Sequence, residues 1–112
     1  MSAICVQIPY DVYESNKEMV VVLPLAGVSK NDISITLNQY ELTINGKRAK
    51  PHLKSDIVNV QEECYRWEFT QIISLPQSVF FEKIHSHFGV DNILTITIPK
   101  LQIPEQIKII VD

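Results

Sequence analysis

The stretch Leu-Thr-Ile-Thr-Ile-Pro-Lys at residues 94–100 decides the fold of this chain. Its three apolar residues alternate with threonine, so their side chains lie on one face of an extended segment. The pair Asp91-Asn92 before the stretch has the composition of a turn, and Pro99 ends the alternating pattern after Ile98. The stretch therefore predicts a half-buried β-strand that begins at a turn.

Similar strand signals run outward from this stretch along most of the chain. Ile33, Ile35 and Leu37 alternate with polar residues, and residues 42–44 continue the pattern as a hairpin partner. The periodicity of residues 81–88 fits a strand or a short helix, and we favour a strand. The expected strands are 11–14, 19–23, 33–37, 42–44, 57–60, 64–75, 81–88 and 94–98. With no sustained helical stripe, the sequence predicts an all-β, immunoglobulin-like antiparallel β-sandwich of seven to eight strands.

Size and composition limit the possible functions. The chain has 112 residues, 46% of them hydrophobic, and this length predicts one globular domain. A net charge of −3 offers no basic surface for nucleic acid, and no apolar run is long enough to span a membrane. Cys5 and Cys64 are too few for a disulfide scaffold or a zinc site. With no secretory signal at its start, the chain is expected in the cytoplasm with both thiols free.

Few residues offer chemistry for a reaction. His85 and His87 would point the same way on a strand and could share a metal, but solvated surface histidines are the commoner outcome. No Ser-His-Asp or paired-carboxylate arrangement has a spacing typical of a catalytic site. We therefore expect a protein that is not an enzyme and that has no catalytic residues, cofactor or metal.

Four blocks in a fixed order resemble the α-crystallin domain of the small heat shock proteins. They are Leu25-x-Gly27-Val28-x-Lys30-x-Asp32-Ile33, Leu42-Thr43-Ile44-x-Gly46-x-Arg48, Phe69 through Leu75-Pro76, and the Leu94–Lys100 stretch. The resemblance covers the chain from about Tyr10 to Val111. It implies a short N-terminal arm at 1–9, an α-crystallin domain at 10–100 and a C-terminal extension at 101–112. With so short an arm, large assemblies are less expected than for longer members.

The resemblance implies an ATP-independent chaperone, or holdase, that binds partly unfolded proteins and limits their aggregation. Its expected partners are such proteins and further copies of itself, as a dimer or larger oligomer, with neither nucleic acid nor membrane. The alternative is a dedicated protein-interaction module, or a co-chaperone-like subunit that joins mixed assemblies with longer relatives.

The C-terminal tail of one copy and a groove on another are expected to mediate assembly. The resemblance implies that Ile107 and Ile109 form a C-terminal Ile-x-Ile anchor, which plugs into a neighbour's groove lined by Ile35, Leu37, Ile84 and Phe88. Two plainer interpretations stay open. The tail could instead form a last strand on its own domain, and the groove residues could be sandwich core.

The resemblance also implies that Ile57, Val58, Asn59 and Val60 form a strand exchanged between the subunits of a dimer; a surface loop is the alternative.

Three positions depart from the family pattern. Ala26 replaces a usual proline, Gln71 a common arginine, and Asn92 the glycine before the Leu-Thr-Ile block. Because Asn tolerates the left-handed conformation, the turn at Asn92 is expected to form.

Overall fold

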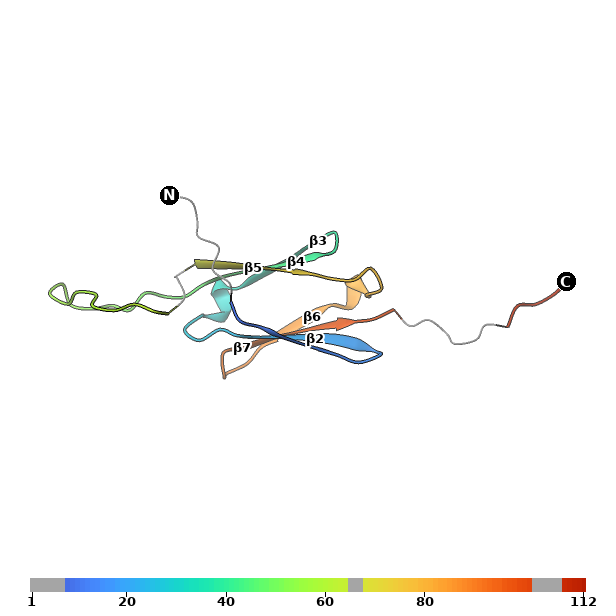
Figure 1. Ribbon diagram of the computed structural model, residues 1–112, viewed down its shortest axis with the longest axis horizontal. Helices are drawn as coiled ribbons and strands as arrows, with labels where there is room; N and C mark the ends of the chain where they lie inside the picture. Colours follow the sequence, from blue (N-terminus) through green and yellow to red (C-terminus); the bar gives the residue numbers. More distant parts are fainter. Residues whose placement is uncertain (1–7, 65–67, 102–107) are drawn as a thin grey trace.

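The computed structural model describes residues 8–64, 68–101 and 108–112, and its regular elements are strands and two short 3₁₀ turns (Figure 1). The two turns are η1 (Lys30–Asp32) and η2 (Phe81–Lys83). The seven strands are β1 (Asp11–Glu14), β2 (Glu18–Pro24), β3 (Ser34–Asn38), β4 (Glu41–Lys47), β5 (Glu68–Ser74), β6 (His85–Phe88) and β7 (Ile93–Pro99). The prediction of an all-β sandwich is confirmed.

The strands form two antiparallel sheets that face one another. One sheet has four strands in the order β1-β2-β7-β6, and the other has three in the order β3-β4-β5. Residues 94–99 of the Leu-Thr-Ile-Thr-Ile-Pro-Lys stretch lie in β7, in the interior of the larger sheet. Ile96 pairs with Val21 of β2 on one side and with Ser86 of β6 on the other. In Figure 1 the three-stranded sheet lies above the four-stranded sheet, with the core between them.

The core is built from the alternating apolar residues of both sheets. Leu94, Ile96 and Ile98 are at most 2% exposed, as the period-two pattern predicts. Ile8, which precedes the first strand, is also buried, and its backbone N–H donates to Oε1 of Gln71 at 3.1 Å. Ile8 therefore belongs to the core, and Gln71 ties its backbone to β5.

The turns follow the chemistry of their residues. Asn92 has a φ of 62°, its side-chain amide donates to the carbonyl of Val28, and its own carbonyl accepts the N–H of Leu25. The left-handed turn expected at Asn92 is thus present, and it joins the β6–β7 hairpin to the loop after β2. Gln39, also at positive φ, forms the β3–β4 turn with Tyr40.

The structure corrects three strand assignments. Residues 57–60, expected as a short strand, form no strand in the chain and lie in the exposed segment between β4 and β5. The strand expected over residues 81–88 is only His85–Phe88, because Phe81–Lys83 forms the turn η2. Phe80 donates to the carbonyl of Pro99, and the N–H groups of Lys83 and Ile84 bond back into the turn instead of extending the ladder along β7. The strand expected to begin at Cys64 begins at Glu68, and residues 65–67 lie outside the described part of the chain.

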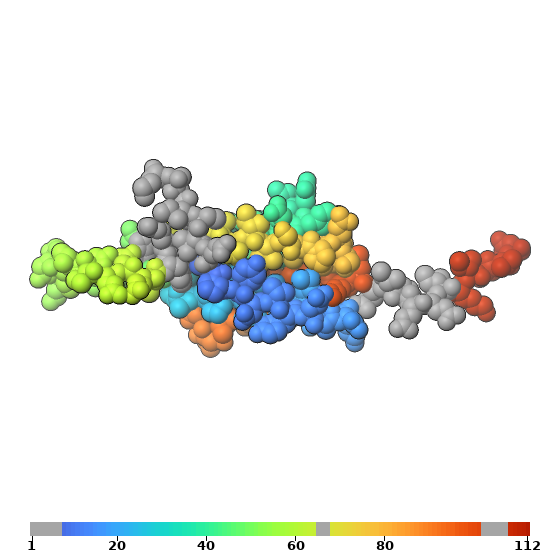
Figure 2. Space-filling model, in the orientation of Figure 1, coloured from blue at the N-terminus to red at the C-terminus, as the bar shows by residue number. Residues whose placement is uncertain are grey.

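Two segments extend from the sandwich at opposite ends (Figure 2). One is the exposed segment of residues 51–64 between β4 and β5, and the other is the described tail at residues 108–112. Within the residues that the structure describes, no helix is long and apolar enough to cross a membrane.

A candidate peptide-binding groove

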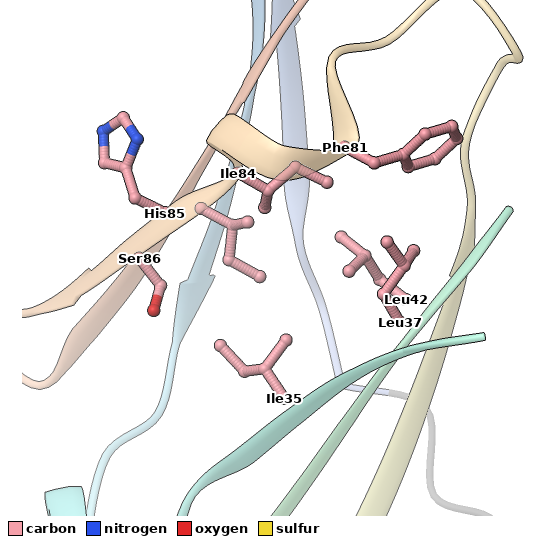
Figure 3. A pocket seen from close by; sticks show the side chains of 8 residues that line it. Ile35, Leu37, Leu42, Phe81, Ile84, His85 and Ser86 are labelled. Atoms are coloured by element: carbon pink, nitrogen blue, oxygen red, sulfur yellow. The ribbon is translucent and has the colours of Figure 1, made fainter. Parts of the chain in front are cut away.

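An apolar groove opens where the edge strands of the two sheets, β3 and β6, face one another. Its first pocket receives Ile35 and Leu37 from β3 on one side and Ile84 from the turn before β6 on the other (Figure 3). Leu42, Phe81, His85, Ser86 and Ile96 complete the lining. Figure 3 shows the imidazole of His85 turned away from the apolar side chains, so the first pocket is lined mainly by aliphatic groups.

A second pocket continues the groove past Ile35 and Ser86, which line both pockets. Its apolar walls are Ile33, Ile35, Phe88 and Leu94, and its ionisable side chains are Lys30 and His87. Since Ile35 is common to the two, the pockets succeed one another along β3. Three of the four predicted groove residues therefore line the first pocket and Phe88 lines the second.

The size of the pockets favours side chains over cofactors. The first encloses about 270 Å³ and the second about 350 Å³. Small-molecule sites usually occupy about 300–1,000 Å³ and bury most of the ligand surface, so these two pockets lie at the lower end of that range and are shallow besides. A row of two small open pockets is instead the form taken by grooves that accept alternate side chains of an extended peptide.

The two histidines of β6 do not build a metal site with their neighbours. His85 and His87 are both exposed and pair across the ladder with Thr97 and Thr95. In the described ranges, no group of three or more His, Cys, Asp or Glu side chains could hold a metal ion.

The C-terminal tail presents apolar side chains to solvent. Ile107, one of the two predicted anchor residues, lies outside the described residues. Ile109 is 80% exposed, and its neighbours Ile110 and Val111 are exposed to a similar degree. Figure 1 shows residues 108–112 away from the sandwich, so in this structure Ile109 does not pack on its own domain.

The predicted exchange segment is likewise exposed. Ile57, Val58 and Val60 are 52%, 75% and 93% exposed, and they form no strand within their own chain. Asn59 beside them donates to a carboxylate oxygen of Glu62. Among the described residues, β1 has a neighbouring strand on one side only, which makes it an edge strand of the larger sheet and a candidate for pairing with another chain.

Sequence reasoning missed part of the groove. Phe81 was assigned to a strand, but in η2 its ring lies 5.3 Å from that of Tyr40 and closes the first pocket at that end. Leu42 and Ile96 were recognised only as alternating strand residues. Tyr40, in the turn between β3 and β4, is the aromatic residue that Phe81 contacts. A contact between these two aromatic residues would have placed Phe81 at the end of the groove.

Comparison with known proteins agrees with this architecture. Residues 11–112 match the model of the Hsp20/alpha crystallin family. Small heat shock protein C4 of Rickettsia felis is 34% identical over 90 residues, which are 80% of this chain and 55% of that protein. A 17.9 kDa class II heat shock protein of Helianthus annuus is 31% identical over 89% of this chain and 62% of its own length. The chain thus spans a little over half of the length of these relatives.

Solved structures show the same fold. Heat shock protein 16.0 from Schizosaccharomyces pombe is 26% identical, with a TM-score of 0.74 over 93% of this chain and 98% of that one. A small heat-shock protein from Xylella fastidiosa shares the fold with a TM-score of 0.79 over 96% of this chain and 97% of that one, at 23% identity. The chain is a member of the Hsp20/alpha crystallin family of small heat shock proteins, a family of chaperones.

Proposed function

We propose that this protein is an ATP-independent holdase that binds partly unfolded chains through the β3–β6 groove and the exposed apolar segments beside it. The observation that carries the proposal is the first pocket, where Ile35, Leu37 and Ile84 are accessible although they belong to the inner face of the sandwich. Unfolding proteins expose apolar side chains on extended backbone, and such segments fit a groove of this form. No enzymatic step is part of the proposal.

The holdase activity is tested by light scattering of several unrelated model proteins heated with an excess of the purified chain. We expect scattering to fall for most of them, and to fall less with Ile84→Asp, which places a charge in the first pocket. Unchanged aggregation of every model protein at excess chain would contradict the proposal. Circular dichroism of Ile84→Asp controls for loss of fold.

We further propose that Ile107 and Ile109 anchor the tail in the groove of a second copy. In an extended chain these two residues point the same way, and burying both contributes on the order of 3–6 kcal/mol before the costs of association. The exposure of Ile109 supports this role. Ile107→Ala/Ile109→Ala is expected to reduce the mass of the assembly, measured by size-exclusion light scattering.

The dimer is proposed to form by exchange of residues 57–60, which pair with an open edge strand of the partner. The support is a row of exposed apolar residues in a segment that has no strand partner in its own chain. Val58→Asp/Val60→Asp should shift the dimer toward monomer while the far-ultraviolet spectrum stays that of a β-sandwich.

The compartment proposed for this holdase is the cytoplasm, where the exposed thiol of Cys64 would stay reduced.

An alternative function is a dedicated interaction module that binds one partner through the same groove. The small pockets favour it, since each has room for one side chain. They therefore suit one defined pair of residues in a partner better than the varied apolar segments of many unfolded proteins. Selective binding of one protein, without protection of unrelated clients, would support the module.

A further inference from the structure

The two open sides of the sandwich are closed in different ways. On one side β3 and β6 leave the groove, whereas on the other the larger sheet, with four strands against three, extends beyond the smaller one. Val12 of the outermost strand β1 pairs with Val21 of β2, so both side chains point to the inner face. Val21 is fully buried but Val12 is 47% exposed, because β1 lies beyond the edge of the three described strands of the smaller sheet. The margin between β1 and β5 is therefore a second place where the apolar interior approaches solvent.

A single side chain of the protein itself closes that margin. Ile8 is 2% exposed, and its backbone N–H donates to Oε1 of Gln71 on β5 at 3.1 Å. Nε2 of Gln71 donates to the carbonyl of Ile72 at 3.3 Å, which fixes the side-chain amide with Oε1 directed at Ile8. Ile8 lies just before β1 in the chain and bonds to β5, so it fills a space between these two edge strands, which we call the Ile8 slot.

The contact that holds Ile8 is of a kind that opens locally. Residues 9–18 are all exposed, so Ile8 is the only buried side chain of the described chain before Val21. Segments with few buried contacts open at a lower free energy than the core, without unfolding of the whole domain. The conformational entropy lost in ordering such a segment weighs more as the temperature rises. Heating should therefore release residues 8–10 while β1 stays paired with β2 and the sandwich stays folded.

We propose that the Ile8 slot is a second, self-occupied binding site for partly unfolded chains, which the protein uncovers on heating by release of residues 8–10. The present occupant defines the chemistry of the ligand, which is an aliphatic side chain next to a backbone N–H that donates to Gln71. Partly unfolded proteins expose both groups. The slot and the β3–β6 groove are on opposite sides of the sandwich, so a ligand in one leaves the other accessible. The inference extends the proposed holdase function and rests on it.

The first test measures binding of a fluorescein-labelled peptide with the sequence of residues 6–10 to the full chain. Ile8→Ala empties the slot, so at 25 °C this variant should bind the peptide at least about tenfold more tightly than the original chain. The reason is that the original chain has an open slot in only a small fraction of molecules, which weakens its apparent affinity by that fraction. A peptide with Ile8→Asp should bind to neither protein. Equal affinity of the original chain and Ile8→Ala for the unchanged peptide would overturn the proposal.

The role of Gln71 is tested in the same assay. Ile8→Ala/Gln71→Leu should bind the peptide about three- to tenfold more weakly than Ile8→Ala, since the acceptor of one hydrogen bond is lost. Unchanged affinity would mean that Gln71 does not receive the ligand backbone and would contradict this part of the proposal.

Hydrogen exchange of the original chain supplies a test that needs no variant. The backbone N–H of Ile8 should exchange at least about tenfold faster than the slowest amides of β4, because it opens without the core. If Ile8 exchanges as slowly as those amides, residues 8–10 leave only when the whole domain unfolds, and the slot is not a separate site.

Client protection separates this inference from the proposed function. With insulin reduced at 25 °C as the aggregating client, Ile8→Ala should halve the scattering at about one third of the concentration that the original chain needs. Ile44→Ala shortens an equal side chain in the closed core and is the matched control; it should bring no gain, and circular dichroism verifies that both variants are folded. If no form of the chain protects any client but the peptide still distinguishes Ile8→Ala, the holdase function fails and the slot stands as a peptide site. If all three protect equally and the peptide does not distinguish them, the holdase stands and the slot is wrong. A lower assembly mass of Ile8→Ala would place residue 8 in a second copy and would also overturn the proposal.

Discussion

Ile35 and Ile44 have the same side chain and are paired across neighbouring strands, yet they differ in exposure. Both point to the inner face of the three-stranded sheet, where Ile35 on β3 lies opposite Ile44 on β4. Ile44 is fully buried under the larger sheet, whereas Ile35 is half-buried and lines the groove. The difference arises because β3 is the edge strand on the side where the groove opens, so the larger sheet does not cover it completely. At the other edge of the same sheet, Phe69 and Ile73 of β5 stay buried.

The comparison shows how one alternating pattern produces both a core and a binding surface. Period-two alternation places a residue on the inner face, but it does not tell whether the opposite sheet reaches that far. In this sandwich β2, β4, β5 and β7 supply the buried core, and the edge strands β3 and β6, on the side where the groove opens, supply the groove. Substitutions at the two positions should therefore separate stability from binding.

The largest effect is expected for Ile44→Ala. This change leaves a cavity among fully buried neighbours, and such substitutions typically cost about 2–5 kcal/mol. We expect a loss of this size in the free energy of unfolding from urea titration with circular dichroism. A loss below about 1 kcal/mol would mean that the two sheets move together to fill the space.

A smaller loss of stability is expected for Gly46→Ala, also on β4. A methyl group there would overlap the ring of Phe69, which lies opposite Gly46 in the β4–β5 ladder. Overpacking of this kind costs about 1–3 kcal/mol. Gly89→Ala is the matched control, because its methyl group would meet chiefly the exposed side chain of Asp91, whose displacement costs one exposed hydrogen bond to the N–H of Ile93 and creates no overlap in the core. The prediction fails if the two variants unfold at the same urea concentration.

Much of this fold could be predicted from the chain, and the errors have physical causes. The alternation at 94–98 and the turn at Asn92 indicated β7 and its hairpin correctly. Residues 81–83 were wrongly predicted as strand because the backbone N–H groups of Lys83 and Ile84 bond back into the turn η2. The alternation of side chains does not indicate such backbone hydrogen bonds. The burial of Ile8 was not foreseen, because a single apolar residue before a proline has no periodicity.

The candidate site was predictable only in part. Ile35, Leu37 and Ile84 were identified through the family resemblance, since periodicity alone described them equally well as core. Lys30 was noted only as part of a sequence block. Its place at the end of the groove depends on η1 and β6 coming together from distant parts of the chain.

For Ile35→Ala we expect a stability loss of about 1 kcal/mol, below that of Ile44→Ala, because its side chain is only half removed from water. The larger consequence should be for assembly, as both pockets lose their common wall. Light scattering should show that assemblies of Ile35→Ala dissociate at protein concentrations where those of Ile44→Ala persist. Both variants are measured at a temperature where Ile44→Ala is still folded. Equal assembly of the two variants would argue that the tail binds elsewhere.

The smallest effect is expected at the ion pair between Lys100 and Glu14, which links the end of β7 to the edge strand β1. Glu14 is largely exposed, and pairs of this kind contribute at most about 1 kcal/mol. Glu14→Gln should therefore lower the free energy of unfolding by less than 1 kcal/mol, and by less still in 1 M NaCl, where the pair is screened. If β1 accepts the exchanged strand of a partner, the same substitution should also weaken the dimer slightly, since it loosens the outer edge of the sheet without touching the core. A stability loss as large as that of Gly46→Ala would show that this edge is held by electrostatics more than by the burial of Val21 and Leu23 behind it.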